Sequence, residues 1–245
     1  MADIPEELVA ILKAAKNVAA LTGAGVSQES GLRTFRDPQT GIYSQHRPED
    51  LASPEGFARD PRLVWDWYAS RREKIKEVRP NPGHYALAEM GRRFPIFTLI
   101  TQNVDGLHQA AGSRGVVELH GNIRQVRCSD CERMADDWQE NGDGVPACKV
   151  CGGLLRPNVV WFGESLPRPE LEAAFAAARS CEVFFSIGTS GVVQPAASLA
   201  VAASNRNAVV VELNPNATSL ASRANFHLSG KSGEVLPELV RAVWG

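Results

Sequence analysis

The chain contains 245 residues, of which 44% are hydrophobic and 22% are charged, and its formal net charge is -2. A chain of this length and composition can bury a sizeable hydrophobic core without disulfides, which excludes a disordered protein or a coiled coil. The weakly acidic balance disfavours nonspecific binding to nucleic acid, and no apolar run reaches the ~20 residues of a membrane span. The N-terminal segment is acidic where a signal peptide would be basic, so we expect a cytoplasmic protein that does not bind membranes.

Short apolar segments that end in small or polar residues alternate with helical patterns along the chain. A helical pattern at residues 5–16 leads directly into residues 17–21, the first of four segments expected to be buried strands. The other expected strands are residues 94–100, 182–187 and 208–213, and the expected helices between them are residues 84–92, 169–179 and 195–205. The last two helices are expected to open with a proline at or near the first helical position. This alternation predicts an α/β fold with a parallel sheet, whose ligand lies at the carboxyl ends of the strands.

Two segments interrupt the alternation. Residues 37–80 begin as a loop and become strongly helical at 61–78, and residues 125–157 are punctuated by cysteine and glycine. We expect both segments to form a smaller domain beside the sheet, with a helical module at 37–80 and a zinc-ribbon module at 125–157. The larger domain would then comprise residues 1–36, 81–124 and 158–245.

Four of the five cysteines form two CxxC pairs that are separated by sixteen residues. This spacing is typical of a tetrahedral zinc ribbon, and four thiolates leave the metal no open position, so we expect one structural zinc ion per chain. A redox dithiol or unrelated core cysteines are the weaker alternatives. The charges around the pairs are mixed, which favours a scaffold over a nucleic-acid module. The expected ligands are Cys128, Cys131, Cys148 and Cys151.

Polar and glycine-rich motifs follow the predicted strands. Residues 23–25 begin like a dinucleotide fingerprint, although Gln28 stands where the strict pattern has glycine or alanine, and a glycine turn without a ligand is an alternative. Residues 101–108 form the densest polar cluster and could fix a sugar or an amide. His120 ends another short apolar run and is a candidate general base, although a lone histidine is more often structural.

Seven motifs, taken together and in order, closely resemble those of the sirtuins over almost the whole chain. They lie at residues 23–27, 31–36, 101–105, 118–121, 162–164 and 188–190, together with the doubled CxxC. The resemblance implies an NAD-dependent protein-lysine deacylase with a Rossmann-like parallel-sheet domain and a smaller domain made of the helical insertion and the zinc ribbon. Leu32-Arg33 replaces the common Ile-Pro, a departure familiar in bacterial-type members.

The resemblance also assigns roles to individual residues. His120 matches the catalytic base and Asn103 a second catalytic residue, while Phe162, Gly163 and Val192 are expected to contact the substrate. Ser232 resembles a contact on the adenine side of the cosubstrate. The other residues expected to bind NAD are Gly23, Ala24, Gly25, Phe35, Arg36, Gln102, Asn103, Asp105, Gly188, Thr189, Ser190 and Asn214.

Tyr68 and Arg71 are three residues apart, which places them on one face of the predicted helix. A phenol and a guanidinium together can bind a carboxylate. The alternative is that Tyr68 is only a buried aromatic residue and Arg71 only a solvated surface residue. The pair matches the Tyr-x-x-Arg of class III sirtuins, which implies removal of succinyl and malonyl as well as acetyl groups from lysine.

Other classes of function remain open at this point. A mono-ADP-ribosyltransferase that uses the same site is the closest enzymatic rival. The two other classes are an NAD-sensing module that binds without turnover and a zinc-ribbon protein that binds nucleic acid. We expect the partners to be acyl-lysine proteins, with no specific nucleic acid and no membrane, and the chain to be a monomer.

Overall fold

The computed structural model describes residues 3–32, 46–140 and 144–245. Within these ranges, six parallel strands form the main sheet, in the order β3-β2-β1-β7-β8-β9. The strands are β1 (Asn17–Thr22), β2 (Ile96–Thr101), β3 (Val117–Glu118), β7 (Val183–Ile187), β8 (Val209–Asn214) and β9 (Phe226–Ser229).

The four strands predicted from the sequence are the four central strands of this sheet. Five of the six residues of β1 and all five residues of β7 are buried, which explains their continuous apolar sequences. The edge strands β3 and β9 contain only two and four residues, so neither gives an apolar run that stands out in the sequence.

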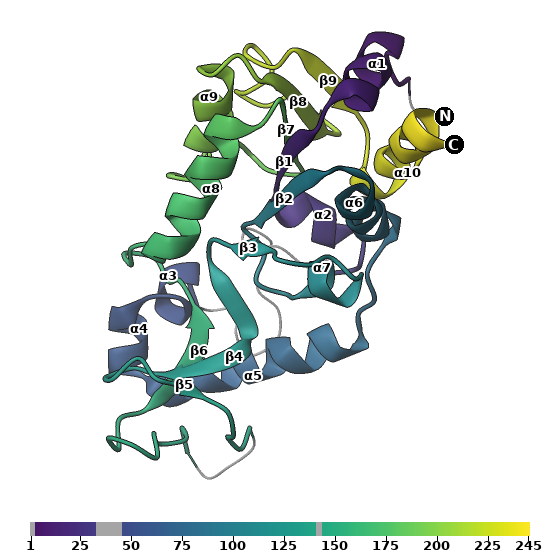
Figure 1. Ribbon diagram of the computed structural model, residues 1–245. Helices are drawn as coiled ribbons and strands as arrows, with labels where there is room; N and C mark the ends of the chain where they lie inside the picture. Colours follow the sequence, from purple (N-terminus) through teal and green to yellow (C-terminus); the bar gives the residue numbers. More distant parts are fainter. Residues whose placement is uncertain (1–2, 33–45, 141–143) are drawn as a thin grey trace.

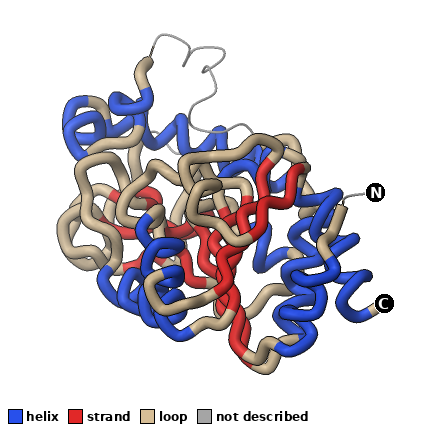
Figure 2. The backbone as a smooth tube through the Cα atoms, turned by 90° about the horizontal axis from the view of Figure 1, so that it is seen from above, coloured by secondary structure: helices blue, strands red, loops and turns tan. Residues whose placement is uncertain are grey.

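Helices cover both faces of the main sheet (Figures 1 and 2). On one face, α1 (Glu6–Ala14), α6 (Pro82–Arg93) and α10 (Ser232–Trp244) share a hydrophobic core with the strands. On the other face, α8 (Arg168–Ser180) and α9 (Ser198–Ser204) form a second core with the same strands. No helix in the described ranges is long and apolar enough to cross a membrane.

The helix predicted at residues 195–205 begins three residues later than expected. Ser198 N donates to Pro195 O and Leu199 N donates to Ala196 O, at 3.0 and 3.1 Å. These bonds to the third residue back are typical of a tight turn. Pro195 therefore opens a turn that precedes α9, and the prediction that it starts the helix is wrong.

The smaller part of the molecule contains helices and a second sheet. The helices are α3 (Pro48–Leu51), α4 (Pro54–Arg59) and α5 (Pro61–Glu77), and α5 matches the helical pattern predicted at 61–78. The second sheet has the order β5-β4-β6 and is antiparallel, with β4 (Gly121–Cys128), β5 (Met134–Ala135) and β6 (Leu155–Val159). Figure 1 shows α5 running alongside this sheet. The division into domains at the stated residues stays a prediction.

The helix α5 joins two small cores through its side chains. Tyr68 and Trp67 pack with Trp161, whereas Trp65 packs with Cys128 and other residues of the cysteine-rich segment. The helix is stabilised at its start by Asp60, whose carboxylate accepts from Leu63 N at 2.9 Å. It thus connects the cysteine-rich segment to the carboxyl edge of the main sheet.

Candidate active site

A glycine turn connects β1 to α2 (Ala24–Gln28) and packs against the turn that follows β7. Gly25 N donates to Gly188 O at 2.8 Å. A Cβ atom on Gly23 would lie 2.7 Å from Gly188 O, and one on Gly25 would lie 2.8 Å from the Gly188 Cα atom. Gly188 has a φ of +60°, which favours glycine. The glycines are therefore required because two backbones touch.

A buried polar cluster lies beside the glycine turn. Asn103 Nδ2 donates to Gly23 O at 2.9 Å and to Ser27 Oγ at 3.0 Å. Ser27 Oγ in turn donates to Asp105 Oδ2 at 2.7 Å, and Leu107 N donates to the other carboxylate oxygen at 2.8 Å. Because both hydrogens of the Asn103 amide are directed into the protein, its orientation is fixed and its Oδ1 oxygen is left for a ligand.

His120 follows β3 and is half-buried at the carboxyl edge of the sheet. Its Nδ1 atom lies 2.9 Å from the carbonyl oxygen of Gln102. A carbonyl oxygen can only accept, so Nδ1 carries the proton and Nε2 has the free electron pair. Burial lowers the pKa of His120, and the bond to Gln102 opposes that shift. The neutral imidazole, with an available Nε2, is therefore the dominant form at neutral pH.

The strand ends farther along the sheet are connected through Thr189. Gln102 Nε2 donates to Thr189 Oγ1 at 3.2 Å, and Asn214 Nδ2 donates to Thr189 O at 2.9 Å. At the far end, the buried Ser232 donates to Glu29 Oε1 at 2.7 Å. The carboxylate of Glu29 thereby caps the N-terminal end of α10.

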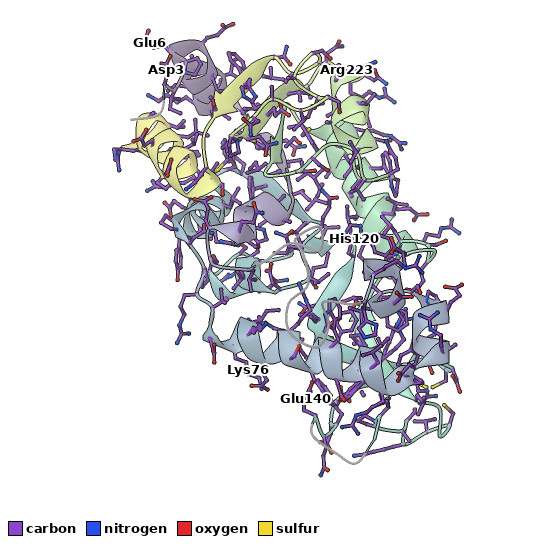
Figure 3. All side chains as sticks on the ribbon, turned by 180° about the vertical axis from the view of Figure 1, so that it is seen from behind. Asp3, Glu6, Lys76, His120, Glu140 and Arg223 are labelled. Carbon is purple, nitrogen blue, oxygen red and sulfur yellow. The ribbon has the colours of Figure 1, made fainter. Side chains whose placement is uncertain are left out.

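A cleft of about 2160 Å³ runs along this edge and brings together most of the residues predicted from the sequence. Figure 3 shows His120 between the main sheet and the part of the molecule that contains α5. The predicted site residues that line the cleft are Gly23, Ala24, Gly25, Tyr68, Arg71, Gln102, Asn103, Asp105, His120, Phe162, Gly163, Gly188, Thr189, Ser190, Asn214 and Ser232.

Among the described residues predicted to bind NAD or substrate, Val192 is the one that does not line the cleft. Val192 is 59% exposed and lies next to Val193, which does line it. Phe35 and Arg36 lie outside the described residues. The contacts expected for these three residues stay predictions.

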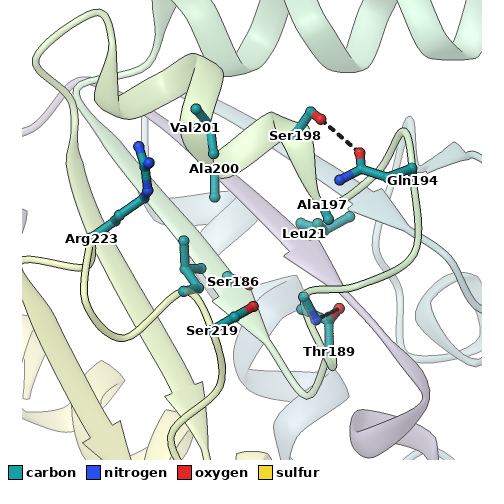
Figure 4. Close-up of a pocket in the computed structure, with 12 residues that line it drawn as sticks. Leu21, Ser186, Thr189, Gln194, Ala197, Ser198, Ala200, Val201, Ser219 and Arg223 are labelled. Atoms are coloured by element: carbon teal, nitrogen blue, oxygen red, sulfur yellow. Dashed lines mark hydrogen bonds between the residues drawn. The ribbon is translucent and has the colours of Figure 1, made fainter.

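A second, smaller cavity of about 170 Å³ lies behind the Thr189 turn (Figure 4). Ser186, Ala200 and Arg223 are among the residues that line it. Thr189 and Gln194 line both this cavity and the large cleft. The loop after β7 therefore contributes residues to the lining of both spaces.

Tyr68 and Arg71 lie at the end of the cleft that faces α5. Tyr68 is only 1% exposed, its hydroxyl oxygen accepts from Trp161 Nε1 at 3.0 Å, and burial raises the pKa of the phenol well above its usual value. The guanidinium carbon of Arg71 lies 4.9 Å from the centre of the Trp67 ring. Burial lowers the pKa of Arg71, but an arginine remains charged at neutral pH. A protonated phenol and a cation thus line one end of the cleft.

Several residues of this region received no role from the sequence. Ser27 is part of a quoted motif, and its position after the glycine turn is the signal that could have identified it. Trp161 directly precedes the motif at 162–164, but its contact with Tyr68 joins residues 93 positions apart. His84 and His108 are fully buried, with ring centres 4.8 Å apart, behind Thr22.

The four predicted zinc ligands converge in the small part of the molecule. Their sulfur atoms all lie within 4.8 Å of one another, and Cys128 Sγ to Cys151 Sγ measures 3.4 Å. Zinc–sulfur bonds of about 2.3 Å in a tetrahedron require sulfur atoms about 3.8 Å apart. Backbone N–H groups of Asp130 and Val150 donate to Cys128 and Cys148, which stabilises thiolates. The cluster therefore fits a closed structural zinc site.

Comparisons with known proteins agree with this geometry. Curated relatives named NAD-dependent protein deacylase are 47% identical in Methylococcus capsulatus, over 98% of both chains, and 46% identical in Pyrococcus furiosus, over 97% of both chains. The solved structure of a Sir2 homolog–NAD complex has a TM-score of 0.92 and 46% identity, and the match covers 99% of this chain and 94% of that chain.

More distant solved structures keep the same fold. A Sir2 protein bound to a myristoylated histone peptide has a TM-score of 0.77 at 36% identity, over 97% of this chain and 94% of that chain.

Residues 23–195 match the family described as the Sir2 family. These residues contain the glycine turn, the polar cluster, His120 and the four cysteines, so the chain belongs to the Sir2 family.

Proposed function

We propose that this chain is an NAD-dependent deacylase of protein lysine. The observation that carries the proposal is His120, whose Nδ1 proton is committed to Gln102 and whose Nε2 is available in a cleft shared with the Asn103 cluster. Relatives that are 44–48% identical over most of their length are named NAD-dependent protein deacylases. A fixed base beside fixed amide and carboxylate groups suits that reaction.

The cleft suits NAD as a cosubstrate. It extends from Asn214 and Ser232 at one end of the sheet edge to Gln102 and Asn103 near its middle. We assign the first end to the adenosine half and the second to the nicotinamide half, with the glycine turn near the diphosphate. When bound, NAD supplies a ribose carbon that becomes electrophilic as nicotinamide leaves, and a hydroxyl of that ribose whose proton must be removed.

His120 is assigned the removal of that proton. The Gln102 carbonyl fixes the tautomer and the orientation of the ring, and the lowered pKa keeps Nε2 unprotonated at neutral pH. Asn103 is assigned the positioning of the bound cosubstrate, because its amide is held by Gly23 and Ser27 before any ligand binds. The products are nicotinamide, O-acyl-ADP-ribose and free lysine.

We further propose that Tyr68 and Arg71 bind the distal carboxylate of succinyl-lysine and malonyl-lysine. Both side chains line the cleft that contains His120. Their environment supports a receptor for an anion, because the phenol remains protonated and able to donate while the guanidinium supplies a positive charge. Acetyl-lysine lacks the carboxylate but can still occupy the rest of the cleft.

The substrates are proposed to be acyl-lysine proteins that reach the cleft along Phe162, Gly163 and Val192. Phe162 and Val192 are 53% and 59% exposed, which suits contact with a peptide. The Sir2-family complexes with a histone peptide and a p53 peptide support this substrate class. The cytoplasmic location, the monomeric state and the lack of nucleic-acid partners stay proposals.

Mass spectrometry of an acetylated peptide incubated with the protein, with and without NAD, tests the reaction. We expect loss of the acyl mass only when NAD is present, together with release of nicotinamide. The mono-ADP-ribosyltransferase alternative gives a different outcome, in which the peptide keeps its acyl group while a protein gains the mass of ADP-ribose.

A further inference from the structure

The indole of Trp161 and the phenol of Tyr68 form a buried hydrogen bond at the acyl end of the cleft. Trp161 Nε1 donates to the Tyr68 hydroxyl oxygen at 3.0 Å, and the two side chains are 3% and 1% exposed. An indole N–H can only donate, so the direction of this bond is fixed. The phenol is therefore the acceptor and still has its own hydrogen to donate.

That hydrogen has a restricted direction. Conjugation holds a phenol hydrogen close to the plane of the ring, with one position on each side of the oxygen. The N–H of Trp161 points at the same oxygen and disfavours the position nearer to it. Within the described residues, Tyr68 donates to no acceptor, and its only side-chain hydrogen bond is the one from Trp161. Burial raises the pKa of the phenol, so the hydrogen is retained. Tyr68 thus presents a single oriented donor that has no partner among the residues that the structure describes.

The Trp161 ring is itself held in place. The guanidinium carbon of Arg156 lies 3.3 Å from the centre of the ring, and Phe57 packs against the ring with centres 5.3 Å apart. Arg156 donates to both carboxylate oxygens of Glu164, at 2.5 and 3.0 Å, and to the carbonyl of Val159 at 3.0 Å. A ring that packs against a guanidinium and a second aromatic ring is restrained from swinging away to release the phenol.

We infer that Trp161 is a positioning residue for acidic acyl groups, which directs the Tyr68 hydroxyl hydrogen toward the carboxylate of the substrate. Trp161 contributes its N–H and not a contact with that carboxylate. The inference rests on the proposed function, because it names a further determinant of the same acyl end of the cleft. It assigns part of the acyl preference to a residue that lies 93 positions from Tyr68 in the chain.

The variant Trp161→Phe tests the inference because it keeps an aromatic ring and removes the N–H. Without that bond the phenol hydrogen can take either in-plane position, so we expect the KM for a succinylated peptide to rise about threefold to tenfold. The KM for the matching acetylated peptide is expected to change by less than about twofold. A purely structural role for Trp161 would instead lower activity on both peptides in parallel, and that result would overturn the inference.

A double-mutant cycle with Tyr68→Phe shows whether Trp161 acts through the phenol. In the Tyr68→Phe background, Trp161→Phe is expected to leave the succinyl-to-acetyl ratio of kcat/KM unchanged, because there is no hydroxyl left to orient. A further fall of that ratio in the double variant would contradict the inference. If Trp161→Phe does not fold, benzothienylalanine at position 161 preserves the shape of the ring and removes the same N–H.

Trp65→Phe is the matched control. Trp65 is also fully buried, and its Nε1 donates to Glu140 O at 3.2 Å in the cysteine-rich segment, away from Tyr68. We expect this variant to lower stability without changing the succinyl-to-acetyl ratio of kcat/KM.

Arg71→Met distinguishes the proposal for Trp161 from the proposal that Tyr68 and Arg71 bind the carboxylate. If Arg71→Met lowers the succinyl-to-acetyl ratio while Trp161→Phe does not, carboxylate recognition stands and the role of Trp161 is wrong. If Arg71→Met also leaves the ratio unchanged, acidic-acyl recognition itself is wrong.

Discussion

The buried Arg72 of α5 and the half-buried Glu140 of the cysteine-rich segment form an ion pair that connects the helix of the acyl end to the zinc site. Arg72 Nε donates to Glu140 Oε1 at 2.6 Å, and the arginine side chain is 6% exposed. Trp138 Nε1 donates to the other carboxylate oxygen at 2.8 Å, and the Arg72 guanidinium carbon lies 4.9 Å from the centre of the Trp65 ring. The position of α5 therefore depends on the cysteine-rich segment.

Removing the carboxylate of this pair is expected to destabilise the protein strongly. Glu140→Ala leaves the Arg72 charge buried without its counterion, which typically costs ~3–5 kcal/mol. Chemical denaturation of the two proteins measures the difference. Asp137→Ala is the control, since Asp137 pairs with Lys149 on the surface, where the side chains are 80% and 77% exposed, and a change below ~1 kcal/mol is expected. Equal effects of the two substitutions would show that the Arg72–Glu140 pair is not the connection.

Loss of zinc is expected to lower both stability and activity. Cys148→Ser removes one of four ligands, and binding to a closed thiolate site contributes folding free energy directly. The melting temperature and the zinc content of the variant, compared with those of wild type treated with a chelator, check this. Cys181→Ser is the control, because Cys181 is buried beside α8 and far in sequence from the four ligands. Chelated protein that melts at the same temperature as the zinc form would refute a structural metal.

His84 and His108 are expected to make the protein less stable in mild acid. Burial lowers the pKa of His84, and burial with the neighbouring His84 lowers the pKa of His108 to about 3. The folded state keeps both rings neutral, whereas the unfolded chain binds protons below about pH 6.5. The stability is therefore fully present above pH 6.5 and is lost as the pH falls below it. His108 contributes a loss of about 1.4 kcal/mol per pH unit down to about pH 3, and His84 contributes a loss of the same sign.

The slope of unfolding free energy against pH between 6.5 and 5 measures this effect. His108→Gln removes one titrating ring and keeps a side-chain nitrogen that can bond to Thr22, so the slope is expected to become shallower by about 1.4 kcal/mol per pH unit. An unchanged slope in the variant would mean that His108 binds a proton in the folded state.

His120→Ala is expected to lower the rate of deacylation by ~10²-fold or more while leaving NAD binding and the melting temperature largely unchanged. The side chain is half-buried and, within the described ranges, hydrogen-bonds only to Gln102, so its loss removes little packing. Because burial lowers the pKa of His120, the wild-type rate is expected to fall only below about pH 6.5. Wild-type turnover by the variant at saturating NAD would remove His120 from the mechanism.

The sequence predicts the features of the site that arise from a pattern within a single segment of the chain. The four central strands and the residues that follow them were predicted from local patterns, and parallel strands bring their carboxyl ends to one edge. The spacing of Tyr68 and Arg71 likewise predicts that a single helix presents both to one place. These residues do line one cleft.

Contacts between distant segments could not be predicted in this way. The Trp161–Tyr68 bond joins residues 93 positions apart, and the Arg72–Glu140 pair joins residues 68 positions apart. Neither contact has a local pattern, and each arises only when α5 packs against segments that come much later in the chain. Gly23 and Gly25 show that a motif can have two causes. The sequence pattern indicates a ligand beside these glycines, but the structure shows that packing against Gly188 also requires them.

Steady-state kinetics of Arg71→Met on succinylated and acetylated forms of one peptide tests the central claim most directly. Arg71 offers a charged donor that methionine lacks, so the KM for the succinylated peptide should rise about tenfold to a hundredfold while that for the acetylated peptide changes much less. Lys76→Met removes a charge from the same helix at a site paired with Glu73 on the surface, and should change neither value. Parallel losses on the two peptides in Arg71→Met, together with a lower melting temperature, would contradict recognition of the acyl carboxylate by Tyr68 and Arg71.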